Sequence, residues 1–149
     1  MNSLPFTLIF ASFFSLFFLF LSVRIGYFRV SPAMKLFFKM DTQTPEKKLQ
    51  RNVRAHGNFS EYVPIFLVLL LIVEIKGDFS FGFLLANCLI FSNGRVANAI
   101  CFAFYDYNPF LRISGMICTY FTLGILAILL LLDAISEQNS VTPLSDILK

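Results

Sequence analysis

The sequence is organised as four long apolar segments separated by polar connections. The segments are Leu4–Val23, Tyr62–Val73, Phe79–Phe104 and Ile113–Leu132. A helix needs about 20 mostly apolar residues to cross a bilayer, and the first and last segments meet that requirement directly. The second meets it when the polar residues before Tyr62 are included. The third meets it when its polar side chains face inward; these are Asn87, Asn93, Arg95 and Asn98.

This pattern predicts an all-α integral membrane protein, a four-helix bundle with helices at about residues 4–28, 45–75, 79–105 and 110–133. Charged residues make up only 14% of the chain, whereas soluble domains carry about 25%. We therefore expect one membrane domain, residues 1–133, followed by a polar C-terminal tail, residues 134–149. The first segment could instead be a signal peptide. No basic residue precedes it and no small-residue cleavage site follows it, which favours a retained helix.

The three cysteines, Cys88, Cys101 and Cys118, all fall within apolar segments. The sequence has no CxxC spacing, and its one histidine has no second histidine to pair with. This pattern is typical of small buried thiols that contribute to packing. It predicts neither a metal site nor a disulfide framework.

Basic residues are concentrated in the first connection. Eight of the twelve lie between Arg24 and Arg54, and the later connections carry only Lys76 and Arg112. By the positive-inside rule the first connection is cytoplasmic, so both termini are predicted outside the cytoplasm. The net charge of +3 is then a sign of topology and of contact with membrane lipids. It does not indicate nucleic-acid binding.

Three polar side chains share one face at the start of the second predicted helix. Arg54, Asn58 and Glu61 are spaced by four and three residues, so they lie on one narrow stripe. Polar side chains are costly on a membrane helix and usually mark a functional site. A purely structural alternative is that Glu61 pairs with Arg54, or with Arg95 from the third helix.

That pairing would leave an excess of positive charge. Arg51, Arg54, Arg95 and Arg112 are predicted at a similar depth, and only Glu61 and Asp106 lie near them. An anionic ligand would balance the excess, because planar guanidinium groups bind carboxylates through two parallel hydrogen bonds.

The other polar residues of these helices support simpler interpretations. His56 lies off the polar stripe and is predicted to face water or lipid headgroups. Glu74 and Lys76, at the far end of the second helix, are expected to be ordinary interfacial residues. Gly94 and Ala97 offer small surfaces for close helix contact in the third helix.

The run Arg54-Ala-His-x-Asn-x-x-Glu-Tyr-x-Pro64, followed by aliphatic residues, resembles the signature of the MAPEG family (membrane-associated proteins in eicosanoid and glutathione metabolism). Gly94-Arg95 and Leu111-Arg112-x-x-Gly-Met116 resemble further motifs of its small bacterial members. The resemblance covers about Leu4 to Asp133. It implies a four-helix protomer that forms a homotrimer, with glutathione bound between adjacent protomers near the cytoplasmic face.

The resemblance also assigns roles to residues. Arg112 would be the catalytic residue, because a neighbouring guanidinium lowers the pKa of a thiol from its usual value near 8.5 and so stabilises the glutathione thiolate. The two carboxylates of glutathione suit the excess of arginines, and its amino group suits Glu61. The candidate glutathione-binding residues are Arg51, Arg54, Asn58, Glu61, Tyr62, Arg95, Asn98 and Tyr105.

These features predict a glutathione-dependent membrane transferase or peroxidase. Its second substrate would be a lipophilic electrophile or a lipid hydroperoxide that arrives through the bilayer. The chain departs from many relatives at Asn98, Cys101 and Phe102, where histidine or tyrosine, glycine and tyrosine are frequent. The alternative is therefore a non-catalytic protein of the same fold that binds glutathione, lipid or a protein partner. A transporter or channel subunit has less support, because no inverted repeat is visible. The expected location is a bacterial inner membrane, with an endoplasmic reticulum membrane as the other possibility.

Overall fold

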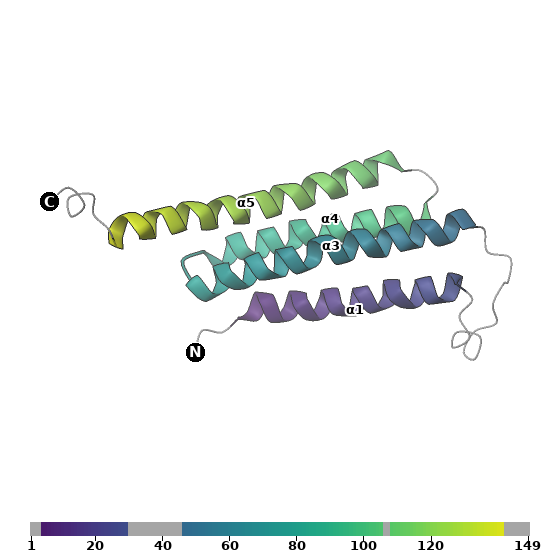
Figure 1. Cartoon of the computed structure of the whole chain (residues 1–149), viewed down its shortest axis with the longest axis horizontal. Coiled ribbons are helices and arrows are strands. Elements are labelled where there is room, and N and C mark those ends of the chain that lie inside the picture. The colour runs from purple at the N-terminus through teal and green to yellow at the C-terminus, as the bar shows by residue number, and fades with distance from the viewer. Residues whose placement is uncertain (1–3, 30–45, 106–107, 142–149) are drawn as a thin grey trace.

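The computed structural model describes residues 4–29, 46–105 and 108–141 (Figure 1). These residues form four helices and, within those ranges, no strand. The helices are α1 (Pro5–Phe28), α3 (Glu46–Lys76), α4 (Phe81–Phe104) and α5 (Pro109–Val141). All four contain a stretch that is long and apolar enough to cross a membrane. The predicted all-α membrane architecture is confirmed.

The helices run alternately up and down the bundle (Figure 1). α1 packs mainly against α3, and α5 packs mainly against α4, while α3 and α4 contact each other between them. The start of α1 and the end of α5 lie at the same end of the molecule. We call the opposite end, which carries the α4–α5 connection, the basic end, because Arg24, Arg51, Arg54 and Arg112 lie there.

The helix boundaries follow local signals. Gly77 directly follows the last residue of α3, and its φ of 75° is a left-handed conformation that glycine adopts without strain. The Ser80 side chain caps α4 by accepting a hydrogen bond from the Phe83 amide at 3.3 Å. The prediction that α3 begins at Pro45 after a Thr44 cap concerns residues outside the described ranges.

α5 is longer than the sequence suggested. Its predicted end was near residue 133, but the helix continues to Val141. No proline or glycine stands between Gly124 and Pro143, so nothing in the sequence stops it earlier. Lys76 also binds this extension, because its ammonium group pairs with Asp133 and lies 2.7 Å from Glu137 Oε1. The first part of the predicted tail is therefore helical.

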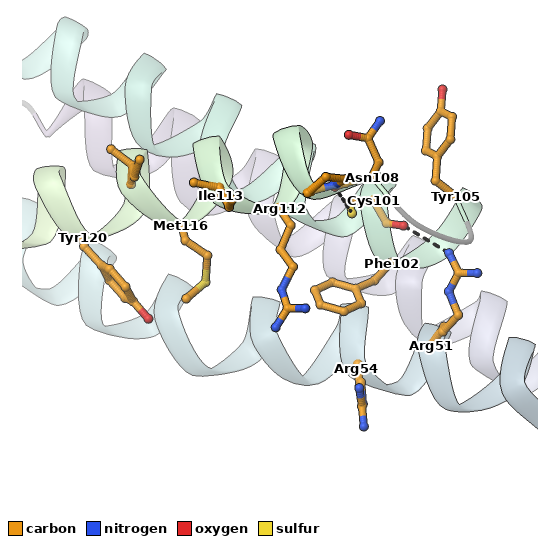
Figure 2. Close-up of a pocket in the computed structure, with 12 residues that line it drawn as sticks. Arg51, Arg54, Cys101, Phe102, Tyr105, Asn108, Arg112, Ile113, Met116 and Tyr120 are labelled. Atoms are coloured by element: carbon orange, nitrogen blue, oxygen red, sulfur yellow. Dashed lines mark hydrogen bonds between the residues drawn. The ribbon is translucent and has the colours of Figure 1, made fainter.

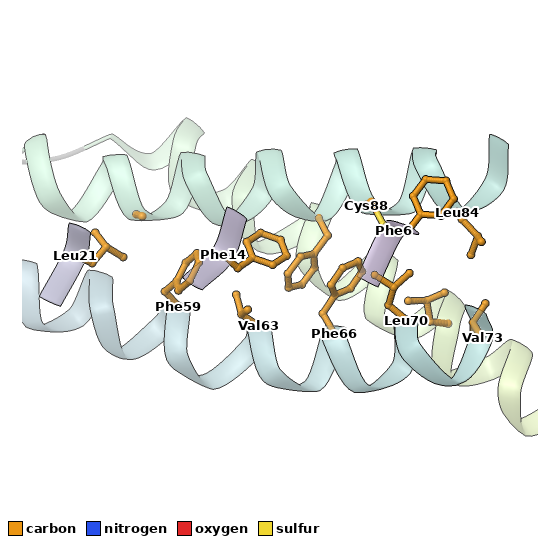
Figure 3. Close-up of a cluster of buried hydrophobic side chains, with 13 residues drawn as sticks. Phe6, Phe14, Leu21, Phe59, Val63, Phe66, Leu70, Val73, Leu84 and Cys88 are labelled. Atoms are coloured by element: carbon orange, nitrogen blue, oxygen red, sulfur yellow. The ribbon is translucent and has the colours of Figure 1, made fainter. Parts of the chain in front are cut away.

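An aromatic cluster joins α1, α3 and α4. The rings of Phe66 and Phe91 are stacked, with centroids 3.8 Å apart and an angle of 6°. Phe14 of α1 meets both of these rings and Phe59 edge-on. Figure 3 shows Phe14 inserted between the other helices of this buried cluster. Because lipid is as apolar as these side chains, close packing is what holds α1 in place.

Small residues bring α4 and α5 together. A Cβ atom added to Gly94 would lie 2.9 Å from both Cys118 Cβ and the Gly115 carbonyl oxygen. A Cβ atom added to Gly115 would lie 2.8 Å from the Gly94 carbonyl oxygen. The close contact expected at Gly94 is present, and it depends on a glycine in each helix.

Three of the four polar side chains predicted to face inward from α4 do so. Asn87, Arg95 and Asn98 are buried, but Asn93 is exposed and its side-chain amide donates to the Leu89 carbonyl at 2.9 Å. The prediction for Asn93 was wrong for a geometric reason. Residues two apart on a helix point about 200° away from each other, so Asn93 and Arg95 cannot share a face.

Glu74 is not the interfacial residue that the sequence suggested. It is 7% exposed, and its carboxylate oxygens accept hydrogen bonds from the backbone amides of Phe6 at 2.9 Å and Thr7 at 2.8 Å. The first amides of a helix have no partner within the helix, and the helix dipole favours a negative charge there. Glu74 of α3 therefore caps the start of α1.

His56 also differs from its predicted environment. Its ring packs against Phe18 of α1, with centroids 4.4 Å apart, and Nε2 lies 2.8 Å from Ser22 Oγ. The side chain is half-buried between α3 and α1. It contributes to helix packing instead of facing headgroups.

Candidate functional site

A cavity of about 690 Å³ lies between α3, α4 and α5 at the basic end (Figure 2). This volume falls in the range of roughly 300–1,000 Å³ that is usual for small-molecule sites. The described residues that line it are Arg51, Arg54, Cys101, Phe102, Tyr105, Asn108, Pro109, Arg112, Ile113, Met116, Ile117 and Tyr120.

The cavity is cationic. Its lining includes three arginines, and none of the described lining residues is acidic. Arg112 extends from α5 toward α3, and its guanidinium carbon lies 5.6 Å from the centroid of the Phe102 ring. Arg51 Nη2 donates to the Cys101 carbonyl at 3.3 Å, while Arg54 is exposed. An arrangement of this kind favours a ligand with negative charge.

Arg24 fixes the helices around the basic end. Its Nε donates to Asn52 Oδ1 at 2.6 Å, and its Nη2 donates to the Ala103 carbonyl at 3.0 Å. The guanidinium carbon also lies 4.0 Å from the centroid of the Phe104 ring. Cations are favoured at a helix C-terminus, where carbonyl groups lack partners within the helix. One side chain of α1 thus connects α3 to the end of α4.

Tyr105 and Asn108, on either side of the α4–α5 connection, line one end of the cavity. Cys101 Sγ lies 3.2 Å from the Asn108 carbonyl oxygen, and Asn108 Oδ1 accepts a hydrogen bond from the Leu111 amide at 3.1 Å. Asn108 therefore caps the start of α5, which places Arg112 in its first turns. Asp106, which the sequence placed near the arginines, lies outside the described residues.

A second set of polar side chains, Arg95, Tyr62 and Tyr120, lies beside the cavity. The buried guanidinium of Arg95 is centred 4.8 Å from the Tyr62 ring centroid, and its Nη1 donates to the Asn58 carbonyl at 3.2 Å. The hydroxyl oxygens of Tyr62 and Tyr120 are 3.3 Å apart. Because Tyr120 lines the cavity, this chain of contacts connects the interior of the bundle to the cavity wall.

The structure separates the predicted site residues into two groups. Arg51, Arg54, Tyr105 and Arg112 line the cavity. The others are outside its lining, and these are Asn58, Glu61, Tyr62, Arg95 and Asn98.

Two residues of the second group have distinct environments. Asn98 is buried, and its Cβ atom lies 3.2 Å from the position that a Cβ on Gly115 would take. Glu61 is exposed on α3 and forms no ion pair within the described parts of the chain. The pairing of Glu61 with Arg54 or Arg95 that the sequence allowed is therefore not found there.

Sequence reasoning missed the apolar wall of the cavity and Tyr120. A signal was present, because Arg112, Met116 and Tyr120 are spaced by four residues and so lie along one side of α5. Without the position of α3, that spacing did not distinguish a cavity wall from a face in contact with lipid.

The fold and the cavity define a class: a helical membrane protein with a cationic cavity at one end of a four-helix bundle. The model of the MAPEG family matches residues 7–132. The chain belongs to the MAPEG family, and the predicted membership is confirmed. Searches of curated protein sequences and of solved structures gave no significant match.

Proposed function

We propose that the protein binds glutathione in the cavity between α3, α4 and α5 and acts as a glutathione-dependent membrane transferase or peroxidase. The observation that carries this proposal is that Arg51, Arg54 and Arg112 all line one cavity in which no described lining residue is acidic. Glutathione brings two carboxylates, which guanidinium groups bind with two parallel hydrogen bonds, and a thiol. The MAPEG family includes glutathione-dependent transferases and peroxidases as well as non-catalytic members.

In this proposal Arg112 is the catalytic residue. Its charge stabilises the thiolate, which is the nucleophilic form of glutathione, and the cavity holds the thiolate close to the second substrate. Arg51, Arg54 and Tyr105 bind the carboxylates and the peptide backbone. The second substrate is a lipophilic molecule that reaches the apolar wall of the cavity from the bilayer.

The exposed charges on α3 support a homotrimer. Arg54 and Glu61 lie two turns apart on one stripe and both are exposed in the single chain. A charged side chain that faces lipid is unfavourable, so a neighbouring copy that covers this stripe would stabilise it. In such an assembly Glu61, Asn58 and the ligand would meet at the interface between copies.

The distribution of basic residues supports an orientation with the basic end in the cytoplasm, both termini outside it, and a bacterial inner membrane as the location. Cytosolic glutathione would then enter the cavity directly. A reporter enzyme fused after Lys149 should be active only outside the cytoplasm, and activity inside the cytoplasm would contradict this orientation.

A non-catalytic glutathione- or lipid-binding protein of the same fold is the second candidate. It is supported by Phe102, whose ring lies beside the Arg112 guanidinium and so covers part of the group that a thiolate would need. It is also supported by Asn98, which is buried against α5 and is outside the cavity lining.

One experiment separates the two candidates. Glutathione is added to the purified protein in detergent, thiolate formation is followed by ultraviolet absorbance, and binding is measured by calorimetry. We expect wild type to bind glutathione as the thiolate, and Arg112→Ala to lose the thiolate signal while it still binds. Arg29→Ala is the matched control, because Arg29 is exposed at the end of α1 and outside the cavity lining.

The results decide between the candidates as follows. Binding without a thiolate signal in wild type supports the non-catalytic protein. A thiolate signal that persists in Arg112→Ala contradicts the role of Arg112. No binding at millimolar glutathione contradicts the enzyme and the glutathione-binding form of the second candidate, and leaves only a lipid-binding protein of the same fold.

A further inference from the structure

The cavity has two chemically different ends. Arg51, Tyr105 and Asn108 lie toward the α4–α5 connection, while Tyr120 lies at the opposite end, and Arg112 lies between the two (Figure 2). The wall near Tyr120 is otherwise apolar and is formed by Ile113, Met116 and Ile117. Among the lining residues, Tyr120 therefore provides the hydroxyl in the part of the cavity that suits a lipophilic substrate.

Tyr62 of α3 contacts this hydroxyl, and Arg95 of α4 lies against Tyr62. Tyr62 of α3 lies 3.3 Å from Tyr120, oxygen to oxygen, with ring centroids 5.9 Å apart. Arg95 of α4 lies over the Tyr62 ring and donates to the Asn58 carbonyl. Arg95 is 2% exposed, and its Nε and Nη2 have no hydrogen-bond partner in the described part of the chain. Its charge next to Tyr62 is thus only weakly compensated.

One of the two protons of this hydroxyl pair is not used in the hydrogen bond between them. Two phenols carry two protons, and only one is used in the hydrogen bond between them. The donor of a hydrogen bond gains negative charge on its oxygen, and the nearby Arg95 guanidinium favours that polarity at Tyr62. When Tyr62 donates to Tyr120, the Tyr120 proton is free to point into the cavity.

We propose that Tyr120 is a catalytic proton donor to the leaving oxygen of a lipophilic hydroperoxide substrate. This inference rests on the proposed function and deepens it. The glutathione thiolate attacks the terminal peroxide oxygen, the S–O bond forms and the O–O bond breaks. The leaving alkoxide takes the Tyr120 proton and becomes an alcohol.

The reaction balances with glutathione as the only reductant. The proton released when the first glutathione ionised returns to Tyr120. A second glutathione reacts with the resulting sulfenic acid to give glutathione disulfide and water. Sulfur is oxidised, and the peroxide oxygens are reduced.

The geometry along α5 suits this step. Arg112 and Tyr120 are eight residues apart, which is about 12 Å along a helix at 1.5 Å per residue. Both side chains extend from α5 toward α3, with Met116 between them. The reacting groups would span about the same distance. They make three successive contacts of roughly 3 Å, from guanidinium to sulfur, from sulfur to peroxide and from peroxide to phenol, and the O–O bond adds its own length.

The test compares two reactions that differ in the leaving group. Cumene hydroperoxide releases an alkoxide, which needs a proton, whereas 1-chloro-2,4-dinitrobenzene releases chloride, which does not. Positioned proton donors contribute about 10²- to 10⁴-fold to such steps. We expect Tyr120→Phe to lower kcat with the hydroperoxide at least about tenfold and to change conjugation of the chloride less than about twofold.

Two further variants sharpen the comparison. Tyr62→Phe should lower kcat with the hydroperoxide less than Tyr120→Phe does, and it should again affect conjugation of the chloride less. The reason is that Tyr120 then keeps its proton but loses the hydroxyl that orients it. Tyr27→Phe, at the end of α1 and outside the cavity lining, removes a hydroxyl elsewhere and should leave both reactions unchanged.

Each contrary result has a separate meaning. Equal losses in both reactions, or no loss with the hydroperoxide, overturn the role of Tyr120. A wild-type protein that conjugates the chloride but does not reduce the hydroperoxide overturns the substrate class and leaves the proposed function standing. A wild-type protein that is inactive with both substrates overturns the proposed function itself.

Discussion

Among the residues that the structure describes, two charged side chains are buried, and their charges are balanced in different ways. Glu74 is fully engaged, because both of its oxygens accept backbone hydrogen bonds from the first turn of α1. Within the described helices, Arg95 donates one hydrogen bond, to the Asn58 carbonyl, and lies against the Tyr62 ring. Both arrangements join one helix to another, so each charged residue contributes to tertiary structure as well as to local electrostatics.

Removing the Glu74 carboxylate should destabilise the bundle. Glu74→Ala leaves the amides of Phe6 and Thr7 without partners in an apolar environment, which costs on the order of 1–3 kcal/mol for a buried unsatisfied group. We expect a lower unfolding temperature in detergent, with partial recovery in Glu74→Gln, which keeps one acceptor. Asp78→Ala, an exposed change at the same end, is the control. Equal unfolding temperatures for Glu74→Ala and wild type would show that the cap contributes nothing.

The sequence allowed some residues to be placed but not others. The inward positions of Asn87, Arg95 and Asn98 followed from the cost of exposing polar groups to lipid. The role of Glu74 could not follow, because it depends on how far α1 is shifted along α3, and neither helix has a pattern that specifies this shift. Tyr120 was missed for a similar reason, since its partner, Tyr62, is 58 residues away in the chain.

At the scale of elements, each helix pair is held by a different type of contact. Edge-on contacts of Phe14 hold α1 on α3 and α4, while Gly94 and Gly115 allow the backbones of α4 and α5 to approach closely. The close approach matters for the site, because α4 and α5 together provide most of the cavity wall. The apolar segments in the sequence were enough to predict four spans. They did not predict the end of α5, whose last turns include the Lys76 partners Asp133 and Glu137.

A methyl group at Gly94 should disturb this helix pair. Gly94→Ala places a Cβ 2.9 Å from backbone and Cβ atoms of α5, and overpacking of this kind costs about 1–3 kcal/mol. Gly124→Ala, on α5 with open space around it, is the matched control and should be neutral or stabilising. Thermal unfolding in detergent distinguishes them. If both variants unfold at the same temperature, the contact between α4 and α5 is less tight than the structure shows.

At the scale of the whole molecule, the single chain leaves two kinds of surface uncovered. One is apolar and suits lipid, as in α1, where Leu8, Ile9 and Leu16 are all more than 60% exposed. The other is the charged stripe of Arg54 and Glu61 on α3. The fold class and the membrane character could be predicted from the apolar segments alone. The extent of the candidate site could not, because it depends on how the helices pack and, under the proposed trimer, on a neighbouring copy.

The proposed trimer, which would cover this stripe, can be tested directly. Treatment of the detergent-solubilised protein with an amine-reactive crosslinker should give a largest product of three copies, because a cyclic assembly closes on itself. The same treatment after denaturation should give monomers only. A product distribution that stops at dimers would rule out the trimer.

The Glu74 cap has a consequence for how the protein is made. The start of α1 leaves the ribosome about 70 residues before the carboxylate that binds its amides. Until α3 enters the bilayer, water at the membrane interface must satisfy those amides, and no contact with α3 fixes the depth of α1. The arrival of Glu74 provides that contact and sets the depth of α1. The final position of the first helix in the membrane is therefore decided by the second one to be synthesised.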